Sequence, residues 1–196
     1  MTLPNLISVL RLLLVPVIVT MIVSGEDAVA FWLFVVAGLS DAADGIIARR
    51  FALYSELGAY LDPIADKALL VSIYLSLGLI GALPVWLVIV VISRDILIVG
   101  GVILSWGMGR PVPMHPLMVS KANTMVQIML AAIVLAEAGL ELSTGGLRLL
   151  LVYAVALTTI VSAASYVVDW FAHMAVTEKN RARETGKDGI REGTNE

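Results

Sequence analysis

Hydrophobic residues fall into six long runs along the chain, separated by short polar segments or by segments rich in glycine and proline. Each run is about 20 residues long, the length that an α-helix needs to cross a hydrocarbon core roughly 30 Å thick. The predicted spans cover residues 6–23, 28–48, 58–80, 84–106, 117–135 and 147–174. The pattern therefore predicts an all-α integral membrane protein with six transmembrane helices.

The composition agrees with a membrane protein and excludes several classes of function. Hydrophobic residues make up 59% of the chain and charged residues 15%, against about 45–50% and about 25% in soluble domains. The absence of cysteine excludes disulfides, thiol nucleophiles and cysteine-held metals, so a metal would need carboxylates or one of two histidines. A net charge of -3 without a basic block gives no reason to expect nucleic acid as a partner. The first span lacks the basic region and cleavage site of a signal peptide, so we expect it to be retained.

The distribution of charge predicts the orientation. Basic residues gather near the span ends that share a side with both termini, namely Arg49, Arg50, Arg110 and Lys121. The opposite side holds mainly acidic residues, namely Glu26, Asp27, Glu137 and Glu141, with Arg148 as its cation. Because cytoplasmic loops collect Lys and Arg, both termini should be cytoplasmic. We predict a six-helix domain over residues 1–175 and a polar, mobile cytoplasmic tail over 176–196.

Four aspartates interrupt the second and third apolar runs: Asp41, Asp44, Asp62 and Asp66. Each carboxylate would cost roughly 2.5–3.5 kcal/mol at the centre of a bilayer, so the set needs a functional reason. Spacings of three and four residues place each pair on one helix face, and a connector of about eight residues makes the two helices antiparallel neighbours. We expect the two pairs to face each other, one to two turns from the cytoplasmic surface.

Four converging carboxylates would repel one another and partly protonate unless cations neutralise them. Two Mg²⁺ or Mn²⁺ ions would balance the charge, and a binuclear site with oxygen ligands suits phosphoryl chemistry. The alternative is that the aspartates are satisfied polar residues that hold the helices together, paired with Lys67 or Arg94. Small residues beside the aspartates would either admit a bulky ligand or allow tight helix packing.

Residues 41–66 read D-A-A-D-G-I-I-A-R-R-F-A-L-Y-S-E-L-G-A-Y-L-D-P-I-A-D. This segment resembles the signature of the CDP-alcohol phosphatidyltransferases, D-x-x-D-G-x-x-A-R-x8-G-x3-D-x3-D, and matches it at all eight fixed positions. The opening P-N-L-I-S-V-L-R also resembles the first helix of that family.

The resemblance implies an enzyme that transfers a phosphatidyl group from CDP-diacylglycerol to an alcohol and releases CMP. Carried over by position, the four aspartates would hold two divalent ions, and Asp66 would also serve as general base. The resemblance assigns the CDP-lipid to Asn5, Gly45, Ala48, Arg49 and Gly58, although Arg49 could also be only a topology signal. It further implies a homodimer, and we expect a bacterial inner membrane with the active site facing the cytoplasm.

The remaining polar residues of the spans are candidates for an acceptor site. Arg94 and Asp95 break the fourth run, and Lys121 opens the fifth with Asn123 and Thr124. We assign the acceptor to Arg94, Arg110 and Lys121; the alternative is an Arg94–Asp pair together with an interfacial lysine.

Two segments bear on the identity of the acceptor. I-S-R-D-I-L-I-V-G and V-S-K-A-N-T-M-V-Q resemble CMP-forming cardiolipin synthases, which use phosphatidylglycerol. Glycerol 3-phosphate carries close to two negative charges and should need more cations than the chain supplies, so we expect phosphatidylglycerol as acceptor. A phosphatidylglycerophosphate synthase using glycerol 3-phosphate is the alternative. A divalent-cation transporter is a remote one, because transporters place their ions near the midplane on broken helices.

Overall fold

The structure is a computed structural model, which describes the backbone of residues 3–51, 56–107 and 118–168 and the side chains of 9–41, 65–101, 107 and 118–168. The described residues are all-α and contain no strand. The helices are α1 (Leu3–Val23), α2 (Asp27–Phe51), α3 (Glu56–Leu79), α4 (Val85–Gly107), α5 (Met118–Gly139) and a further helix over Leu147–Val168. Each predicted apolar run thus coincides with one helix, which confirms the helical fold.

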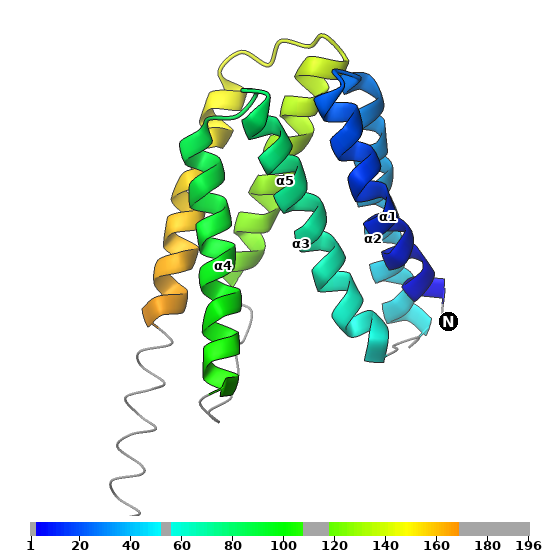
Figure 1. Ribbon diagram of the computed structural model, residues 1–196, viewed down its shortest axis with the longest axis vertical. Helices are drawn as coiled ribbons and strands as arrows, with labels where there is room; N and C mark the ends of the chain where they lie inside the picture. Colours follow the sequence, from blue (N-terminus) through cyan, green and yellow to red (C-terminus); the bar gives the residue numbers. More distant parts are fainter. Residues whose placement is uncertain (1–2, 52–55, 108–117, 169–196) are drawn as a thin grey trace, which may run out of the picture.

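The helices run alternately up and down, so that the turns after α1, α3 and α5 lie at one end of the bundle (Figure 1). We call this the upper end, and the end with residues 3 and 168 the lower end. Helices α3 and α5 pack together in the middle (Figure 1). Helix α1 contacts α2 and α3, α2 contacts α5, and α3 contacts α4. The short upper turns therefore bring together helices that are neighbours in sequence, whereas the α2–α5 contact joins distant segments.

Glycines end two helices at the upper end. Gly25 and Gly81 have φ angles of 76° and 75°, in the left-handed region that a side chain disfavours. The Gly81 amide donates to the Gly78 carbonyl at 3.2 Å, which closes the last turn of α3. These positions stop the helices where the chain must reverse.

All six described helices contribute to the core, which contains fully buried residues such as Ile18, Tyr74 and Leu130. The hydroxyl of Tyr74 donates to the Gln127 carbonyl at 3.1 Å, which satisfies a buried polar group and ties α3 to α5. At the upper end α5 approaches α2 closely: a Cβ added at Gly139 would lie 2.6 Å from backbone atoms of α2. Only glycine fits this contact.

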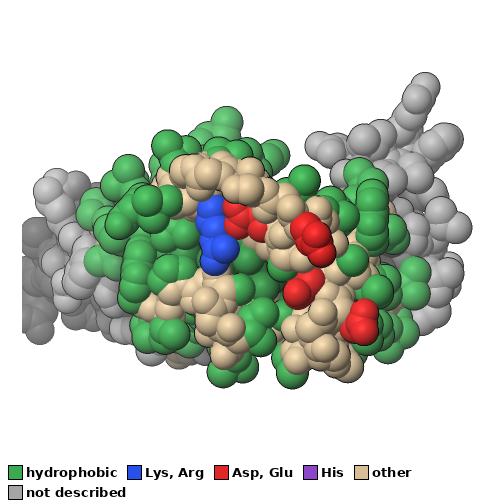
Figure 2. Space-filling view, turned by 90° about the horizontal axis from the view of Figure 1, so that it is seen from above, with side chains coloured by type: hydrophobic (Ala, Val, Ile, Leu, Met, Phe, Trp, Pro, Cys, Tyr) green, Lys and Arg blue, Asp and Glu red, His purple; other side chains and the backbone are tan. Residues whose placement is uncertain are grey.

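The outside of the bundle is largely hydrophobic. Leu79, Met118 and Leu149 are among many large apolar side chains that are more than half exposed. Seen from the upper end, hydrophobic side chains surround the acidic and basic ones (Figure 2). Among the described residues, Met118–Gly139 and Leu147–Val168 are long and apolar enough to span a membrane, and Val9–Val23 is a shorter apolar helix. Six helices are confirmed, whereas six membrane crossings and cytoplasmic termini stay predictions.

Several predictions fall on residues whose structure is not described. The last predicted span continues to residue 174, beyond the described end of its helix at Val168. The domain boundary at residue 175, the tail over 176–196 and Arg110 also lie outside the described residues.

Candidate functional site

One buried arginine joins two of the four aspartates singled out by the sequence. Arg11, on α1, has a side chain that is 2% exposed. Its Nη2 donates to Oδ1 of Asp41 on α2 at 2.5 Å, and its Nη1 donates to Oδ1 of Asp66 on α3. The side chains of both aspartates are 46% exposed. Three helices therefore meet at one group of charges, which we call the Arg11 cluster.

The Arg11 cluster lies well inside the bundle. Asp41 and Asp66 are each ten residues from the lower ends of their helices, at Phe51 and Glu56. At 1.5 Å per residue this is about 15 Å, or nearly three turns. Both helices continue past the apolar runs, which were predicted to end at residue 48 and to begin at residue 58. The depth of one to two turns below the membrane surface stays a prediction.

The other predicted site residues lie on the same helices, but their side chains are outside the described residues. Asp44, Gly45, Ala48 and Arg49 belong to α2, Gly58 and Asp62 to α3, and Asn5 to α1. Where side chains are described, no group of three or more His, Cys, Asp or Glu residues converges. Two carboxylates do converge, and their hard oxygen atoms are the ligands that Mg²⁺ and Mn²⁺ prefer, so the donor set fits a divalent metal.

A second group of charges lies on α3 and α4, and we call it the Asp95 cluster. Oδ1 of Asp95 accepts from Arg94 Nη1 at 2.7 Å and from Lys67 Nζ at 2.6 Å. Two cations on one carboxylate leave a net charge of +1. The side chains of Arg94 and Asp95 are 3% and 9% exposed, whereas that of Lys67 is 40% exposed. The cluster is therefore a buried ion pair with one accessible cation.

All three nitrogen atoms of the Arg94 side chain donate hydrogen bonds. Besides Asp95, its Nη2 donates to the hydroxyls of Ser120 at 2.6 Å and Ser162 at 2.8 Å, and its Nε donates to Ser162 at 3.3 Å. Its guanidinium carbon lies 5.8 Å from the centroid of the Tyr166 ring. Arg94 thus connects α4 to α5 and to the Leu147–Val168 helix.

These contacts change the partners expected for two of the aspartates, Asp41 and Asp66. Lys67 and Arg94 were the expected partners if the aspartates of the second and third spans only held helices together. In the described part of the chain both cations pair with Asp95, and Arg11 is the partner of Asp41 and Asp66. Lys67 follows Asp66 directly, and successive helical residues point about 100° apart, so it faces a different neighbour.

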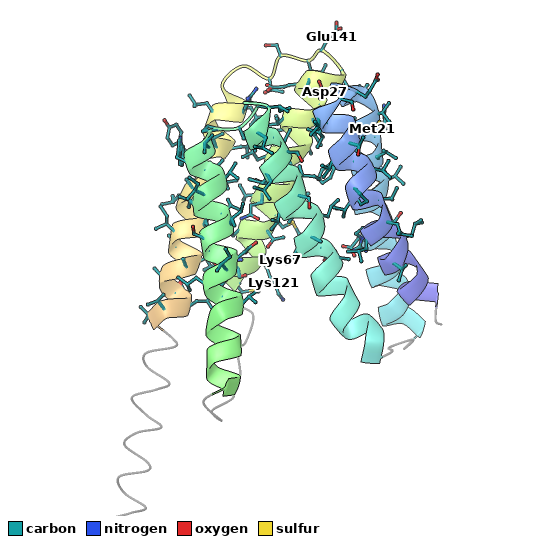
Figure 3. All side chains as sticks on the ribbon, in the orientation of Figure 1. Met21, Asp27, Lys67, Lys121 and Glu141 are labelled. Atoms are coloured by element: carbon teal, nitrogen blue, oxygen red, sulfur yellow. The ribbon has the colours of Figure 1, made fainter. Side chains whose placement is uncertain are left out.

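Lys121 and Asn123, near the start of α5, lie in different environments. Lys121 is exposed, at a height similar to that of Lys67 (Figure 3). Asn123 is fully buried, and its Oδ1 accepts from Thr158 at 2.8 Å and Thr159 at 2.9 Å. Asn123 therefore joins α5 to the Leu147–Val168 helix, while Lys121 is available to an anion.

Arg11 is the main residue that the sequence interpretation missed. It is a single cation within the apolar run 6–23. A charge in a bilayer is costly in free energy, so Arg11, like the aspartates, needs a structural or functional reason. Ser120 and Ser162 also went unnoticed, and nothing in the sequence distinguishes them from other serines of apolar helices.

Comparison with known proteins gives consistent results. Residues 1–171 match the family model described as CDP-alcohol phosphatidyltransferase. The chain is 36% identical over 181 residues to a Rattus norvegicus protein named cardiolipin synthase (CMP-forming), and 35% identical over 181 residues to the Homo sapiens protein of the same name. Each alignment covers 84% of this chain and 60% of the relative.

A relative with another named reaction is equally similar. The Oryza sativa subsp. japonica protein named CDP-diacylglycerol--glycerol-3-phosphate 3-phosphatidyltransferase 1, chloroplastic, is 36% identical over 185 residues, covering 85% of this chain and 56% of the relative. The chain thus spans less than two thirds of the length of these relatives. The family model covers most of the chain and includes the four-aspartate signature, so the chain belongs to the CDP-alcohol phosphatidyltransferase family.

Proposed function

We propose that the chain transfers a phosphatidyl group from CDP-diacylglycerol to an alcohol acceptor and releases CMP. The observation that carries the proposal is the meeting of Asp41 and Asp66, the two ends of the signature, at one guanidinium although they lie on different helices. Membership of the family supports the same reaction.

The reaction needs an acceptor for one proton. The hydroxyl oxygen of the alcohol forms a bond to the phosphorus that bears diacylglycerol, and the bond from that phosphorus to the CMP oxygen breaks. The electron pair of the broken bond leaves with CMP. The hydroxyl proton goes to Asp66, whose half-exposed carboxylate lies on α3 at the Arg11 cluster.

Asp41, Asp44, Asp62 and Asp66 would hold two divalent ions, Mg²⁺ or Mn²⁺. Bound there, the ions would supply positive charge to the pyrophosphate and to the leaving CMP. Asn5, Gly45, Ala48, Arg49 and Gly58 would form the CDP-lipid site, because small side chains in the sequence would let a bulky ligand approach the backbone.

We propose phosphatidylglycerol as the acceptor, which makes cardiolipin the product. The net charge of +1 in the Asp95 cluster matches the single negative charge of a phosphodiester. Lys67 is its accessible cation, and Arg94, Arg110 and Lys121 complete the proposed acceptor site. Because every nitrogen of Arg94 already donates within the protein, Arg94 would act by fixing the cluster and its charge.

The test is release of CMP from CDP-diacylglycerol by the purified protein in lipid nanodiscs with Mg²⁺. Phosphatidylglycerol, glycerol 3-phosphate, inositol and serine are compared as acceptors, and we expect fast release with phosphatidylglycerol. The rice relative makes glycerol 3-phosphate the second candidate. Fast release with glycerol 3-phosphate and none with phosphatidylglycerol would establish that alternative. Metal flux into liposomes with no CMP from any acceptor would establish a transporter instead.

The proposed setting is a membrane whose cytoplasmic face exposes the site, and for a bacterial protein this is the inner membrane. The hydrophobic outer surface of the helices supports a lipid environment. We also propose a homodimer on the basis of the family resemblance. A single-protomer mass in both mild detergent and nanodiscs would contradict it.

A further inference from the structure

We infer that Arg11 is an internal counter-ion that competes with divalent metal ions for Asp41 and Asp66. The inference rests on the proposed metal site, and it adds a role for a residue outside the four-aspartate signature. It follows from the position of Arg11, from the oxygens that it contacts and from the exposure of its two partners.

Arg11 and a metal ion would use the same ligand atoms. The guanidinium contacts Oδ1 of Asp41 with one terminal nitrogen and Oδ1 of Asp66 with the other. A divalent ion at these oxygens would lie against a buried positive charge. Arg11 must therefore oppose metal binding, either by occupying the oxygens or by repelling the ion.

Arg11 donates fewer hydrogen bonds than Arg94, the other buried arginine of the described chain, and its partners are more exposed. All three nitrogens of Arg94 donate hydrogen bonds, and its partner Asp95 is 9% exposed. By contrast, Nε of Arg11 is buried and has no hydrogen-bond partner among the described residues. The partners of Arg11 are 46% exposed, so an ion can reach them from outside. The contacts of Arg11 are therefore better suited than those of Arg94 to exchange for contacts with a metal ion.

Removing the charge of Arg11 should have two opposite effects. Without metal, Asp41 and Asp66 lose the cation between them, so the unfolding temperature should fall. With metal, the ion no longer meets a like charge, so its affinity should rise. A residue that only packs the helices together would lower stability and metal affinity alike when replaced. A lower unfolding temperature without metal together with a higher metal affinity therefore distinguishes competition from a merely structural role.

The experiment compares the full chain with Arg11→Met, which keeps the length of the side chain but not its charge, and with Arg11→Lys, which keeps the charge but cannot span both carboxylates. Arg148→Met is the matched control. Arg148 pairs with Glu137 at 3.2 Å at the upper end of the bundle, away from the Arg11 cluster. Binding of Mn²⁺ in nanodiscs is measured by electron paramagnetic resonance of the free ion. Thermal unfolding is followed with EDTA and with saturating Mn²⁺.

We expect Arg11→Met to lower the Kd for Mn²⁺ by about tenfold or more and to lower the unfolding temperature in EDTA. Arg11→Lys should give a smaller decrease in Kd, and Arg148→Met none. An unchanged or higher Kd in Arg11→Met overturns the competition while leaving the metal site in place. If Arg11→Met does not fold, an unchanged or higher Kd in Arg11→Lys has the same meaning. Failure of the wild-type chain to bind Mn²⁺ overturns both this inference and the proposed metal site, whereas CMP release tests the proposed reaction separately.

Discussion

Replacing Arg94 with methionine should destabilise the protein much more than replacing Lys67 with methionine, although both cations contact the same oxygen of Asp95. Arg94 is 3% exposed and donates to Asp95, Ser120 and Ser162. Removing one partner of a buried ion pair costs about 3–5 kcal/mol. Lys67 remains on Asp95 in the variant and keeps its charge compensated, so we expect about 3 kcal/mol.

Lys67→Met should cost about 1 kcal/mol or less, because the lysine is 40% exposed and exposed ion pairs contribute little. Arg94 still neutralises Asp95 in this variant. If Lys67 is the accessible cation for the acceptor, the same change should raise the KM for phosphatidylglycerol while the protein stays folded.

Equilibrium unfolding by SDS in mixed micelles, followed by tryptophan fluorescence, measures the two free energies. The double variant Arg94→Met/Asp95→Leu is the control. It removes the buried carboxylate together with its buried cation, so it should be more stable than Arg94→Met alone, in which Asp95 keeps only the 40% exposed Lys67. Equal losses in the two single variants, or a loss below about 0.5 kcal/mol for Arg94→Met, would refute the reasoning.

Three further predictions concern the Arg11 cluster and the helix contacts. Asp66→Asn should abolish CMP release but preserve most binding of CDP-diacylglycerol, because an amide keeps the shape and cannot accept the proton; release and binding assays on one sample check this. Asp41→Asn should raise the Mg²⁺ concentration that gives half-maximal activity, since it removes a charged ligand, and a Mg²⁺ titration measures the change. Gly139→Ala should lower the free energy of unfolding by about 1–3 kcal/mol, since the new Cβ would lie 2.6 Å from the α2 backbone. Gly38→Ala is its control in the same unfolding experiment, because nothing lies within 4 Å of the added Cβ, and it should not destabilise.

Each of these predictions has an outcome that contradicts it. Near-normal turnover of Asp66→Asn would remove the general-base role. An unchanged Mg²⁺ requirement in Asp41→Asn would argue against that residue as a ligand. Equal stability of the Gly139 and Gly38 variants would show that α2 and α5 do not approach as closely as the structure has them.

The helices could be predicted from sequence because hydrophobic length is a local property. Their ends were less accurate, since helix propensity does not stop where hydrophobicity does. Helix α2 continues through Arg49 and Arg50 to Phe51, because arginine is a good helix former. Helix α5 continues from residue 135 to Gly139 through Glu137, another helix former.

The convergence of Asp41 and Asp66 was expected from sequence, but for a reason that the structure corrects. The short connector was expected to make α2 and α3 neighbours, whereas among the described residues these two helices share no contact and each packs against α1. Arg11 stands out in the sequence as a single cation in an apolar run, but nothing there places it between the two aspartates. Arg11 reaches the aspartates through the packing of α1 against both α2 and α3, and a single sequence contains no signal for such tertiary contacts. The same limit applies to the contact between α2 and α5, which are separated by two helices along the chain.

Helix α3 separates two groups of opposite charge, and this arrangement suits the proposed reaction. Asp66 pairs with Arg11 on α1, which also pairs with Asp41 on α2. The guanidinium and the two carboxylates give the described part of the Arg11 cluster a net charge of -1. Lys67, the next residue, faces α4, where the Asp95 cluster has a net charge of +1. A negative group attracts metal ions and with them the pyrophosphate of the donor, whereas a positive one attracts an anionic acceptor directly. Because the two residues are adjacent on one rigid helix, they would fix the distance between the proposed donor and acceptor sites, which is what an attack of one lipid headgroup on another requires.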